Sequence, residues 1–428
     1  MNGATDPAAA GPYPAAQTTV TVPGTQGAGL TTDLYYPGDG TGLSPGAGKC
    51  PVILLGHGFL QSRNNHVNQG LHLATRGYIV LIPDSNEASN HSRYADDLIQ
   101  CLNWIEAQGT DPASIFSGRV RADRTGATGH SAGGLSAILA ASRDSRIRAV
   151  APMDPVDNGG LGEAALPQVA APVAITYSEP SICNANGSGL VLYNAATAPK
   201  RGIRIVGANH TDPQDPPSFT SILLCGGANS TRQALYRRYV TGWFDYHLRE
   251  DALYGPWAFN LPGGQLEEDL LTGQITHAED PAPIEAWRFV HFGPDHLAPP
   301  IAGDEADPDA DGWPNLMEYA LHTNPLAPDP GPVIESSLLP VGEDRYVSIT
   351  FPLVTAATDI TYQIQTSSTL LEWIPGSSYS GQVRTPDTGA TTEVSQSGSG
   401  LESITVRDNV PTTSGPRFLQ LQVRRWRE

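Results

Sequence analysis

The chain has 428 residues, of which 16% are charged, and 44 acidic against 25 basic residues give a net charge of −19. This excess of acid argues against nucleic acid as a partner. No run of about 18 apolar residues occurs, so the sequence predicts no membrane span. The scarcity of lysine beside abundant Ser, Thr, Gly and Pro is typical of secreted bacterial proteins. Met1–Gly3 leads directly into a Pro/Ala-rich segment, as expected after removal of a signal peptide.

The first 250 residues predict a mostly parallel sheet flanked by helices, an α/β fold. After a loose leader over 1–16, alternating polarity over Thr18–Val22 and Thr31–Tyr36 predicts a hairpin of edge strands. Further strands are predicted over Pro51–Leu55, Tyr78–Pro83, Val120–Thr128, Ile147–Pro152, Pro172–Tyr177 and Gly202–Val206. Helices are predicted over Asn68–Arg76, Tyr94–Gln108, Leu135–Ser142 and Thr231–Leu248. Alternation of strands and helices favours a parallel sheet, whose chemistry lies at the carboxyl ends of its strands.

The character of the chain changes after about residue 250. Following the first domain (17–255), we expect a linker over 256–297, a Pro/Asp/Gly-rich segment over 298–330 and a small all-β sandwich over 331–428. The prediction of a sandwich rests on short segments of alternating polarity that are separated by turn residues. These segments are Tyr346–Phe351, Thr361–Thr366, Ser403–Val406 and Arg417–Val423.

The segment Gly129–Gly133 (Gly-His-Ser-Ala-Gly) matches G-x-S-x-G, the turn that presents a nucleophilic serine at the end of a strand. A strand is predicted before it and a helix after it, as this motif requires. We therefore predict that Ser131 is a nucleophile rather than a turn serine. The amide of Ala132, the next residue, would supply one half of an oxyanion hole. The amide of Phe59, after the strand-ending turn at His57, would supply the other half.

A serine nucleophile needs a histidine base and an acid that orients it. His210 follows the last predicted parallel strand, which is where a base is expected. Asp154, Glu179 and Asp157 all follow strands and are candidates for the acid, with Asp154 favoured. Asn86, His91 and Asn209 are further candidates for lining the cleft.

Four segments resemble the chlorophyllase branch of α/β-hydrolases: Gly56–Leu60, Pro83–Asn86, Gly129–Gly134 and Asp154–Val156. Cutinases and polyester hydrolases of the dienelactone-hydrolase type are near relatives of that branch. The resemblance covers roughly residues 18–250 and implies hydrolysis of carboxylic esters without a catalytic metal or cofactor. In the chlorophyllase pattern the acid has an Asp-Pro-Val context, which supports Asp154. The cutinase-like pattern places the acid one strand later, near Glu179, where this chain reads Ser-Glu-Pro.

The four cysteines all lie in the first 225 residues, and none has the C-x-x-C spacing of a zinc site. Neighbouring positions in the predicted fold favour the disulfides Cys50–Cys101 and Cys183–Cys225. The alternative is four buried free thiols.

The segment Asp307–Glu318 matches the calcium-loop pattern D-x-D-x-D-G-x5-E in full. The pattern assigns calcium ligands to the carboxylates of Asp307, Asp309, Asp311 and Glu318 and to the backbone carbonyl of Trp313, with Asn315 as a ligand or water contact. The segment resembles the single calcium loops of dockerin-like and thrombospondin type 3 segments. A short helix is predicted over Pro314–Leu321. We expect structural Ca²⁺ here; the alternative is an acidic linker turn.

Together these features predict a secreted serine esterase acting on short-chain esters or on polyester or chlorophyll-like substrates. Two alternatives remain: a lipase or platelet-activating-factor acetylhydrolase-like phospholipase, and a polymer-binding protein whose sandwich is the working module. Trp373, Tyr379 and Trp426 are the aromatic residues considered for polymer binding. The sequence leaves the oligomeric state open.

Overall fold

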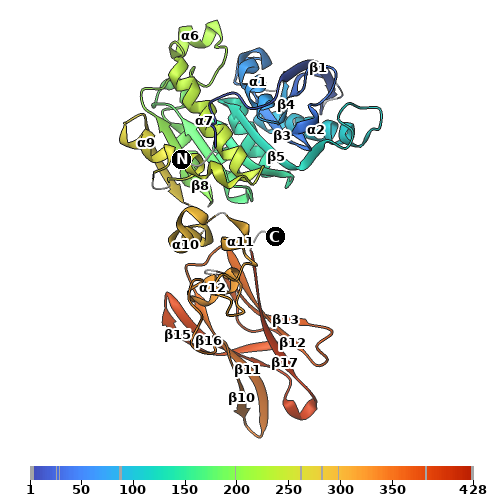
Figure 1. Ribbon diagram of the computed structural model, residues 1–428, viewed down its shortest axis with the longest axis vertical. Coiled ribbons are helices and arrows are strands. Elements are labelled where there is room, and N and C mark those ends of the chain that lie inside the picture. The colour runs from blue at the N-terminus through green and yellow to red at the C-terminus, as the bar shows by residue number, and fades with distance from the viewer. Residues whose placement is uncertain are drawn as a thin grey trace. The chain divides into compact units, whose positions relative to one another are not determined.

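The computed structural model describes residues 4–25, 27, 29–85, 89–197, 199–260, 263–280, 283–296, 298–380 and 383–425. The chain divides into two compact units, Met1–Pro281 and Ala282–Glu428 (Figure 1). The segment 256–297, expected to be a linker, is shared between these units. No helix among the described residues has the length and apolar character needed to cross a membrane.

The first unit is built on a nine-stranded sheet with the order β1-β2-β4-β3-β5-β6-β7-β8-β9. Its strands are β1 (Ala15–Pro23), β2 (Gly29–Pro37), β3 (Cys50–Gly56), β4 (Ile79–Pro83), β5 (Val120–His130), β6 (Ile147–Met153), β7 (Val173–Tyr177), β8 (Lys200–Ile205) and β9 (Ile275–Asp280). Neighbours from β4 through β8 are parallel. Strands β1, β2 and β9 extend the two edges in antiparallel pairing.

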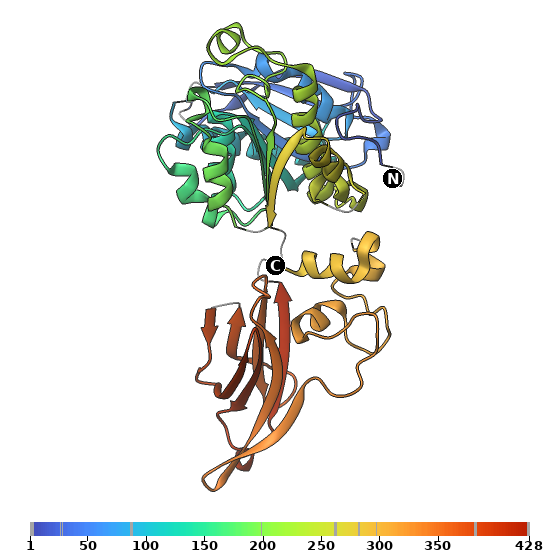
Figure 2. The same cartoon turned by 90° about the vertical axis from the view of Figure 1, so that its left-hand side faces the viewer.

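Helices cover both faces of this sheet (Figures 1 and 2). The alternation of side chains along β3 shows why: Val52 and Leu54 pack in the core under α2 and α3, whereas Ile53 points to the opposite face, beside Phe244 of α7. The helices are α1 (Val67–Thr75), α2 (His91–Thr110), α3 (Ala132–Ala141), α4 (Leu161–Ala165), α5 (Ser188–Ala195), α6 (Phe219–Cys225), α7 (Ser230–His247), α8 (Gly255–Ala258) and α9 (Gln265–Leu271).

The α/β architecture predicted from the sequence is confirmed, and each predicted strand and helix of the first unit is present within a few residues of its expected bounds. The short helices α4, α5, α6, α8 and α9 were not predicted. Strand β9 lies in the segment expected to be a linker and instead pairs with β8 along its whole length.

The second unit contains two four-stranded antiparallel sheets, ordered β10-β11-β16-β15 and β14-β13-β12-β17, which form the predicted sandwich. Its strands are β10 (Glu335–Val341), β11 (Asp344–Val354), β12 (Ile360–Ser367), β13 (Ile374–Ser380), β14 (Val383–Thr385), β15 (Thr391–Ser399), β16 (Leu401–Asp408) and β17 (Phe418–Arg425). Three helices precede the strands: α10 (Pro283–Phe292), α11 (Pro299–Ala302) and α12 (Asn315–Leu321).

The aromatic residues considered for polymer binding occupy different environments. Tyr379 is buried in the sandwich core, where its ring packs beside that of Phe351. Tyr379 is therefore unavailable as a surface contact, because its inward-facing position on β13 places it between the sheets. Trp373 is half-buried, and Trp426 lies outside the described residues.

Candidate active site

Ser131 occupies the sharp turn between β5 and α3. Its backbone has φ +55° and ψ −117°, a strained conformation for a residue with a side chain. The glycines around it allow the turn to close: a Cβ on Gly133 would lie 2.1 Å from the carbonyl oxygen of Gly56. Glycine therefore lets the first turn of α3 rest against the end of β3, and the turn presents Ser131 at the carboxyl edge of the sheet.

Three polar side chains form a continuous chain of contacts at this edge. The Nε2 atom of His210 lies 3.0 Å from the Oγ atom of Ser131, and its Nδ1 atom lies 2.6 Å from Oδ2 of Asp154. Ser131 follows β5, Asp154 follows β6 and His210 follows β8, so parallel strands deliver all three to one edge. The arrangement has the geometry of a nucleophile, a base and an orienting acid.

Asp154 is fully buried and held by several hydrogen bonds. The backbone N–H of Ser178 donates to its Oδ1 at 3.0 Å, and the Ser178 hydroxyl donates to its Oδ2 at 2.6 Å. The side-chain amide of Asn184 donates to the Ser178 hydroxyl at 3.0 Å and lies 3.4 Å from Asp154. These hydrogen bonds fix the position of the Asp154 carboxyl group beside His210. Sequence reasoning missed Asn184, which lies 30 residues further along the chain in no recognisable motif.

The other two acid candidates have different partners. Glu179 accepts a hydrogen bond from the backbone N–H of Gly207 at 3.0 Å and lies 3.4 Å from Arg204, and its side chain is 39% exposed. Asp157 accepts hydrogen bonds from backbone amides at the start of α4, including that of Gly162 at 2.8 Å. Glu179 therefore supports the turn before His210, and Asp157 caps α4.

A second histidine, His130, lies beside the base. Its ring is 4.5 Å from that of His210, and it is completely buried. Burial, reinforced by repulsion from His210 and His66, holds the pKa of His130 well below its ordinary value. His130 is therefore neutral near pH 7 and adds no positive charge beside the base. Gln61 lies 3.2 Å from Nδ1 of His130 and accepts a hydrogen bond from the N–H of Gly58 at 3.1 Å.

A cleft of about 340 Å³ opens at Ser131. Its lining includes both predicted oxyanion-hole residues, Phe59 and Ala132, together with the predicted His91. Ala132 is the first residue of α3, where amides have no acceptor within the helix. Asn209 instead donates to the carbonyl of Gly227, and Asn86 lies outside the described residues.

A disulfide between Cys183 and Cys225 lies in the cleft wall, where it joins the 3₁₀ turn at Ile182–Asn184 to the end of α6. The predicted Cys50–Cys101 disulfide is wrong: both residues are buried free cysteines. Their sulfur atoms contact different parts of the core, Cys50 near the Gly48 carbonyl and Cys101 near the Thr32 hydroxyl. Burial raises the pKa of Cys50 to about 11 and that of Cys101 to about 12.

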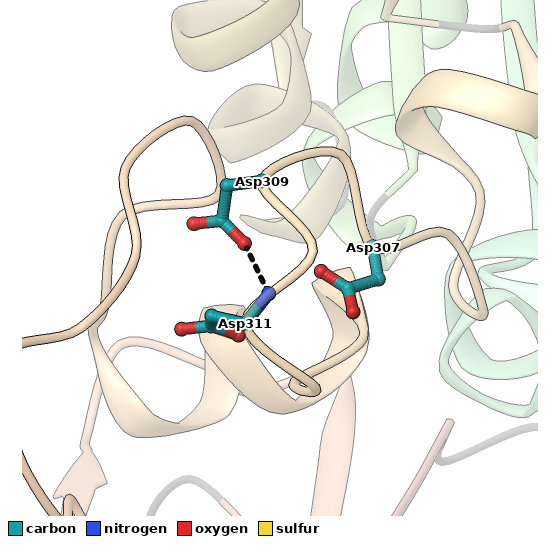
Figure 3. Close-up of side chains that lie close together, drawn as sticks. All are labelled: Asp307, Asp309 and Asp311. Atoms are coloured by element: carbon teal, nitrogen blue, oxygen red, sulfur yellow. Dashed lines mark hydrogen bonds between the residues drawn. The ribbon is translucent and has the colours of Figure 1, made fainter.

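The second unit contains the acidic loop, which we define as Asp307–Glu318. Carboxylate oxygens of Asp307, Asp309 and Asp311 lie within 4.8 Å of one another (Figure 3). Their other oxygens shape the loop: Asp309 accepts from the N–H of Asp311 at 3.2 Å, and Asp307 accepts from the N–H of Gly312 at 3.0 Å. The side-chain amide of Asn315 donates to the carbonyls of Ile301 and Gly303, which fixes the approach to the loop.

Comparison with known proteins addresses the first unit. The chain matches the family model described as PETase, PET hydrolase-like, over residues 3–254, which is more than half of its length. It is also similar to the bis(hydroxyethyl) terephthalate hydrolase of Streptomyces coelicolor, with 22% identity over 271 residues that cover 62% of this chain and 77% of that protein. The predicted kinship with polyester hydrolases is confirmed at the level of the group. The chain therefore belongs to the PET hydrolase-like family and is a carboxylic ester hydrolase.

Proposed function

We propose that this protein is a serine esterase that cleaves esters of hydrophobic acids, aromatic diesters and polyesters among them, through Ser131, His210 and Asp154. The observation that carries this proposal is the contact chain from Ser131 Oγ through His210 to Asp154 at the floor of an open cleft. The family match supports ester hydrolysis, and the geometry supports these residues as the group that performs it.

The geometry supports a two-step reaction. His210 Nε2 accepts the proton of the Ser131 hydroxyl while Oγ attacks the ester carbonyl carbon. Asp154 holds His210 in the tautomer with the proton on Nδ1 and stabilises the imidazolium that forms. The tetrahedral intermediate collapses, His210 protonates the departing alcohol, and an acyl group remains on Ser131. Water then attacks this acyl group with His210 as the base, which releases the carboxylic acid and restores Ser131.

The alkoxide that forms in each step needs hydrogen-bond donors. We assign this role to the backbone amides of Ala132 and Phe59, as the sequence predicted. Ala132 begins α3, so the positive end of the helix dipole adds to its N–H. Removing one such donor from a serine hydrolase costs roughly a hundredfold to a thousandfold in rate.

The mouth of the cleft favours a hydrophobic acyl group. Its lining includes the apolar side chains of Phe59, Leu60 and Val156, together with Leu224 of α6. Two of these side chains are largely exposed, Phe59 at 56% and Leu224 at 67%. Such apolar surface beside a nucleophile suits a flat aromatic acid or a polymer chain. The relative from Streptomyces carries the name of a terephthalate diester hydrolase, which makes a terephthalate ester the first substrate to test.

We also infer that the protein works outside the reducing cytosol. The Cys183–Cys225 disulfide joins two walls of the cleft, and disulfides of this structural kind persist in oxidising compartments. The low lysine content noted above points the same way.

The deciding experiment measures hydrolysis of bis(hydroxyethyl) terephthalate and of p-nitrophenyl acetate, butyrate and palmitate by the wild type and by Ser131→Ala. We expect turnover of the diester and the short esters, and a loss of at least about a thousandfold in Ser131→Ala. Ser142→Ala, at the opposite end of α3, is the matched control and retains activity. Activity that survives in Ser131→Ala would refute the assignment. Preference for palmitate would favour a lipase instead.

A further inference from the structure

The acidic loop has the backbone form that an ion-binding turn requires. Gly312 has φ +97°, which few residues other than glycine adopt, and it occupies the sixth position, where calcium loops turn sharply. The N–H of Trp313 donates to Asp311 at 2.8 Å. These bonds hold three aspartates with oxygen atoms converging from positions 1, 3 and 5 of the loop. Such a cluster is common on protein surfaces and does not by itself indicate a cation site. The evidence for a bound cation comes from the buried groups around it.

Glu318, at the twelfth position, is the first of these groups. Its side chain is fully buried in α12, yet its Oε2 atom has no hydrogen-bond partner among the described residues. Its other oxygen has only the Thr323 hydroxyl, at 3.5 Å. A buried, unpaired carboxylate directed at further carboxylates is costly unless a cation lies between them.

Asp329 is the second group, and it lies outside the twelve-residue pattern. Its backbone N–H donates to Oδ2 of Asp311 at 3.1 Å, which brings the segment after α12 back onto the acidic loop. Its own Oδ2 atom is buried and has no hydrogen-bond partner among the described residues. Asp309 likewise has a buried Oδ2 atom for which the described part of the chain provides no hydrogen-bond partner.

We propose that a calcium ion binds at the acidic loop and that Asp329 supplies a ligand from outside it. The ligand set is then the carboxylates of Asp307, Asp309, Asp311, Glu318 and Asp329 with the backbone carbonyl of Trp313. Six oxygen donors, five of them charged, suit Ca²⁺, which accepts six to eight oxygens in flexible geometry. Mg²⁺ prefers to retain several waters and suits so dense a protein cage poorly.

The ion would fasten the loop to the sandwich. Glu318 lies in α12. The residue after it, Tyr319, donates its hydroxyl hydrogen to Asp359 at 2.8 Å. The hydroxyl of Tyr362 on β12 donates to the carbonyl of Ala320 at 2.7 Å. Asp329 directly precedes the chain that enters β10. Calcium would therefore join α12, the loop before it and the segment after it into one rigid entry to the sandwich.

The test measures metal binding to the full chain after removal of metals. Terbium luminescence reports on this site directly, because Trp313 lies in the loop and transfers excitation energy to a bound Tb³⁺; isothermal titration with Ca²⁺ gives the affinity. We expect binding of one equivalent of Ca²⁺, which displaces Tb³⁺. Asp329→Asn, which keeps the backbone N–H and nearly the same shape, should weaken binding about tenfold or more.

Glu305→Gln is the matched control. Glu305 is an exposed acid two residues before Asp307, and its substitution removes the same charge as Asp329→Asn. It should change the affinity less than about twofold. Ester hydrolysis verifies that each variant is folded in the first unit, and circular dichroism verifies the sandwich. The proposal is overturned if the wild type binds no Ca²⁺ at millimolar concentration. It is also overturned if Asp329→Asn binds like the wild type while Asp311→Asn does not bind, because the ion would then use the loop alone.

Discussion

Asp154 and Glu179 follow adjacent parallel strands, and each presents a carboxylate at the same edge of the sheet. Asp154 turns back toward Ser131 with φ +43°, which directs its side chain under the imidazole of His210. Glu179 has a longer side chain that reaches away, to the Gly207 amide and to Arg204. The two acids therefore have different partners: Asp154 contacts the imidazole of His210, and Glu179 supports the turn that precedes it.

Substituting these two acids separates their roles. Asp154→Asn removes the acceptor that holds the His210 tautomer, so we expect kcat to fall by about a thousandfold to ten-thousandfold. Because the new amide also faces the buried Ser178 donors, the free energy of unfolding should fall by about 1–3 kcal/mol. Glu179→Gln leaves that acceptor in place, so the loss should stay within about tenfold. The measurement is p-nitrophenyl butyrate kinetics beside thermal unfolding of each variant. Equal losses in both variants would contradict the assignment of Asp154.

Single residues with a motif were predictable, and residues without one were not. Ser131 and His210 were predicted from their positions after predicted strands, and the structure brings the two side chains into contact. The sequence offered three acids and favoured Asp154 on its Asp-Pro-Val context, but the contact itself depends on the turn after β6, which brings the Asp154 carboxyl group to His210. No sequence motif pointed to Asn184 or Asp329. Each residue lies outside the motifs and reaches its site only through a contact made in the folded chain, Asn184 with Ser178 and Asp329 with Asp311.

At the scale of elements, α6 is the part of the first unit most dependent on a covalent tie. Phe219, Leu223 and Leu224 are largely exposed, and the structure describes no fully buried residue in this helix. A helix of seven residues with so little buried surface has small stability of its own. The bond from Cys225 to Cys183 therefore fixes the wall of the cleft that α6 provides.

Removing that bond should cost stability and loosen the cleft. The disulfide closes a segment of 42 residues, for which typical stabilisation is about 2–4 kcal/mol. We expect Cys183→Ser with Cys225→Ser to lower the free energy of unfolding of the first unit by that amount, and to raise KM for hydrophobic esters more than it lowers kcat.

Reduction provides the control for this prediction. A reducing agent should bring the wild type to the stability of the double variant and leave the variant unchanged. Thiol titration of the denatured, unreduced wild type should find two thiols, from Cys50 and Cys101. A count of zero thiols would show that Cys50 and Cys101 form a second disulfide. An unchanged stability of the double variant would show that packing alone holds α6.

The predictability of elements follows the strength of their patterns. Buried strands such as β3 and long amphipathic helices such as α2 were predicted because apolar runs and helical periodicity are strong signals. Strand β9 reads Ile-Thr-His-Ala-Glu-Asp and sits at the sheet edge, where pairing with β8 rather than burial stabilises it. Helix α6 is short and unsupported on its own, so no periodicity revealed it.

At the scale of the whole molecule, catalysis and the acidic loop belong to different units. Ser131, Asp154 and His210 all lie within Met1–Pro281, whereas every ligand of the proposed calcium site lies within Ala282–Glu428. Each unit has its own hydrophobic core, one under the parallel sheet and one between the antiparallel sheets. Metal binding is therefore expected to stabilise the second unit without entering the chemistry of the first.

Chelation of the full-length protein tests this separation. A ligand present at a hundredfold excess over its dissociation constant stabilises the unit that binds it by about 2.7 kcal/mol. For a unit of this size that corresponds to roughly 5–10 °C, so EDTA should lower one calorimetric transition by this amount and excess Ca²⁺ should restore it. The initial rate on p-nitrophenyl butyrate at 25 °C should change less than about twofold, since the residues described as lining the cleft all belong to the first unit. If EDTA instead abolishes turnover and Ca²⁺ restores it, the ion acts on the active site, and the two units do not work independently.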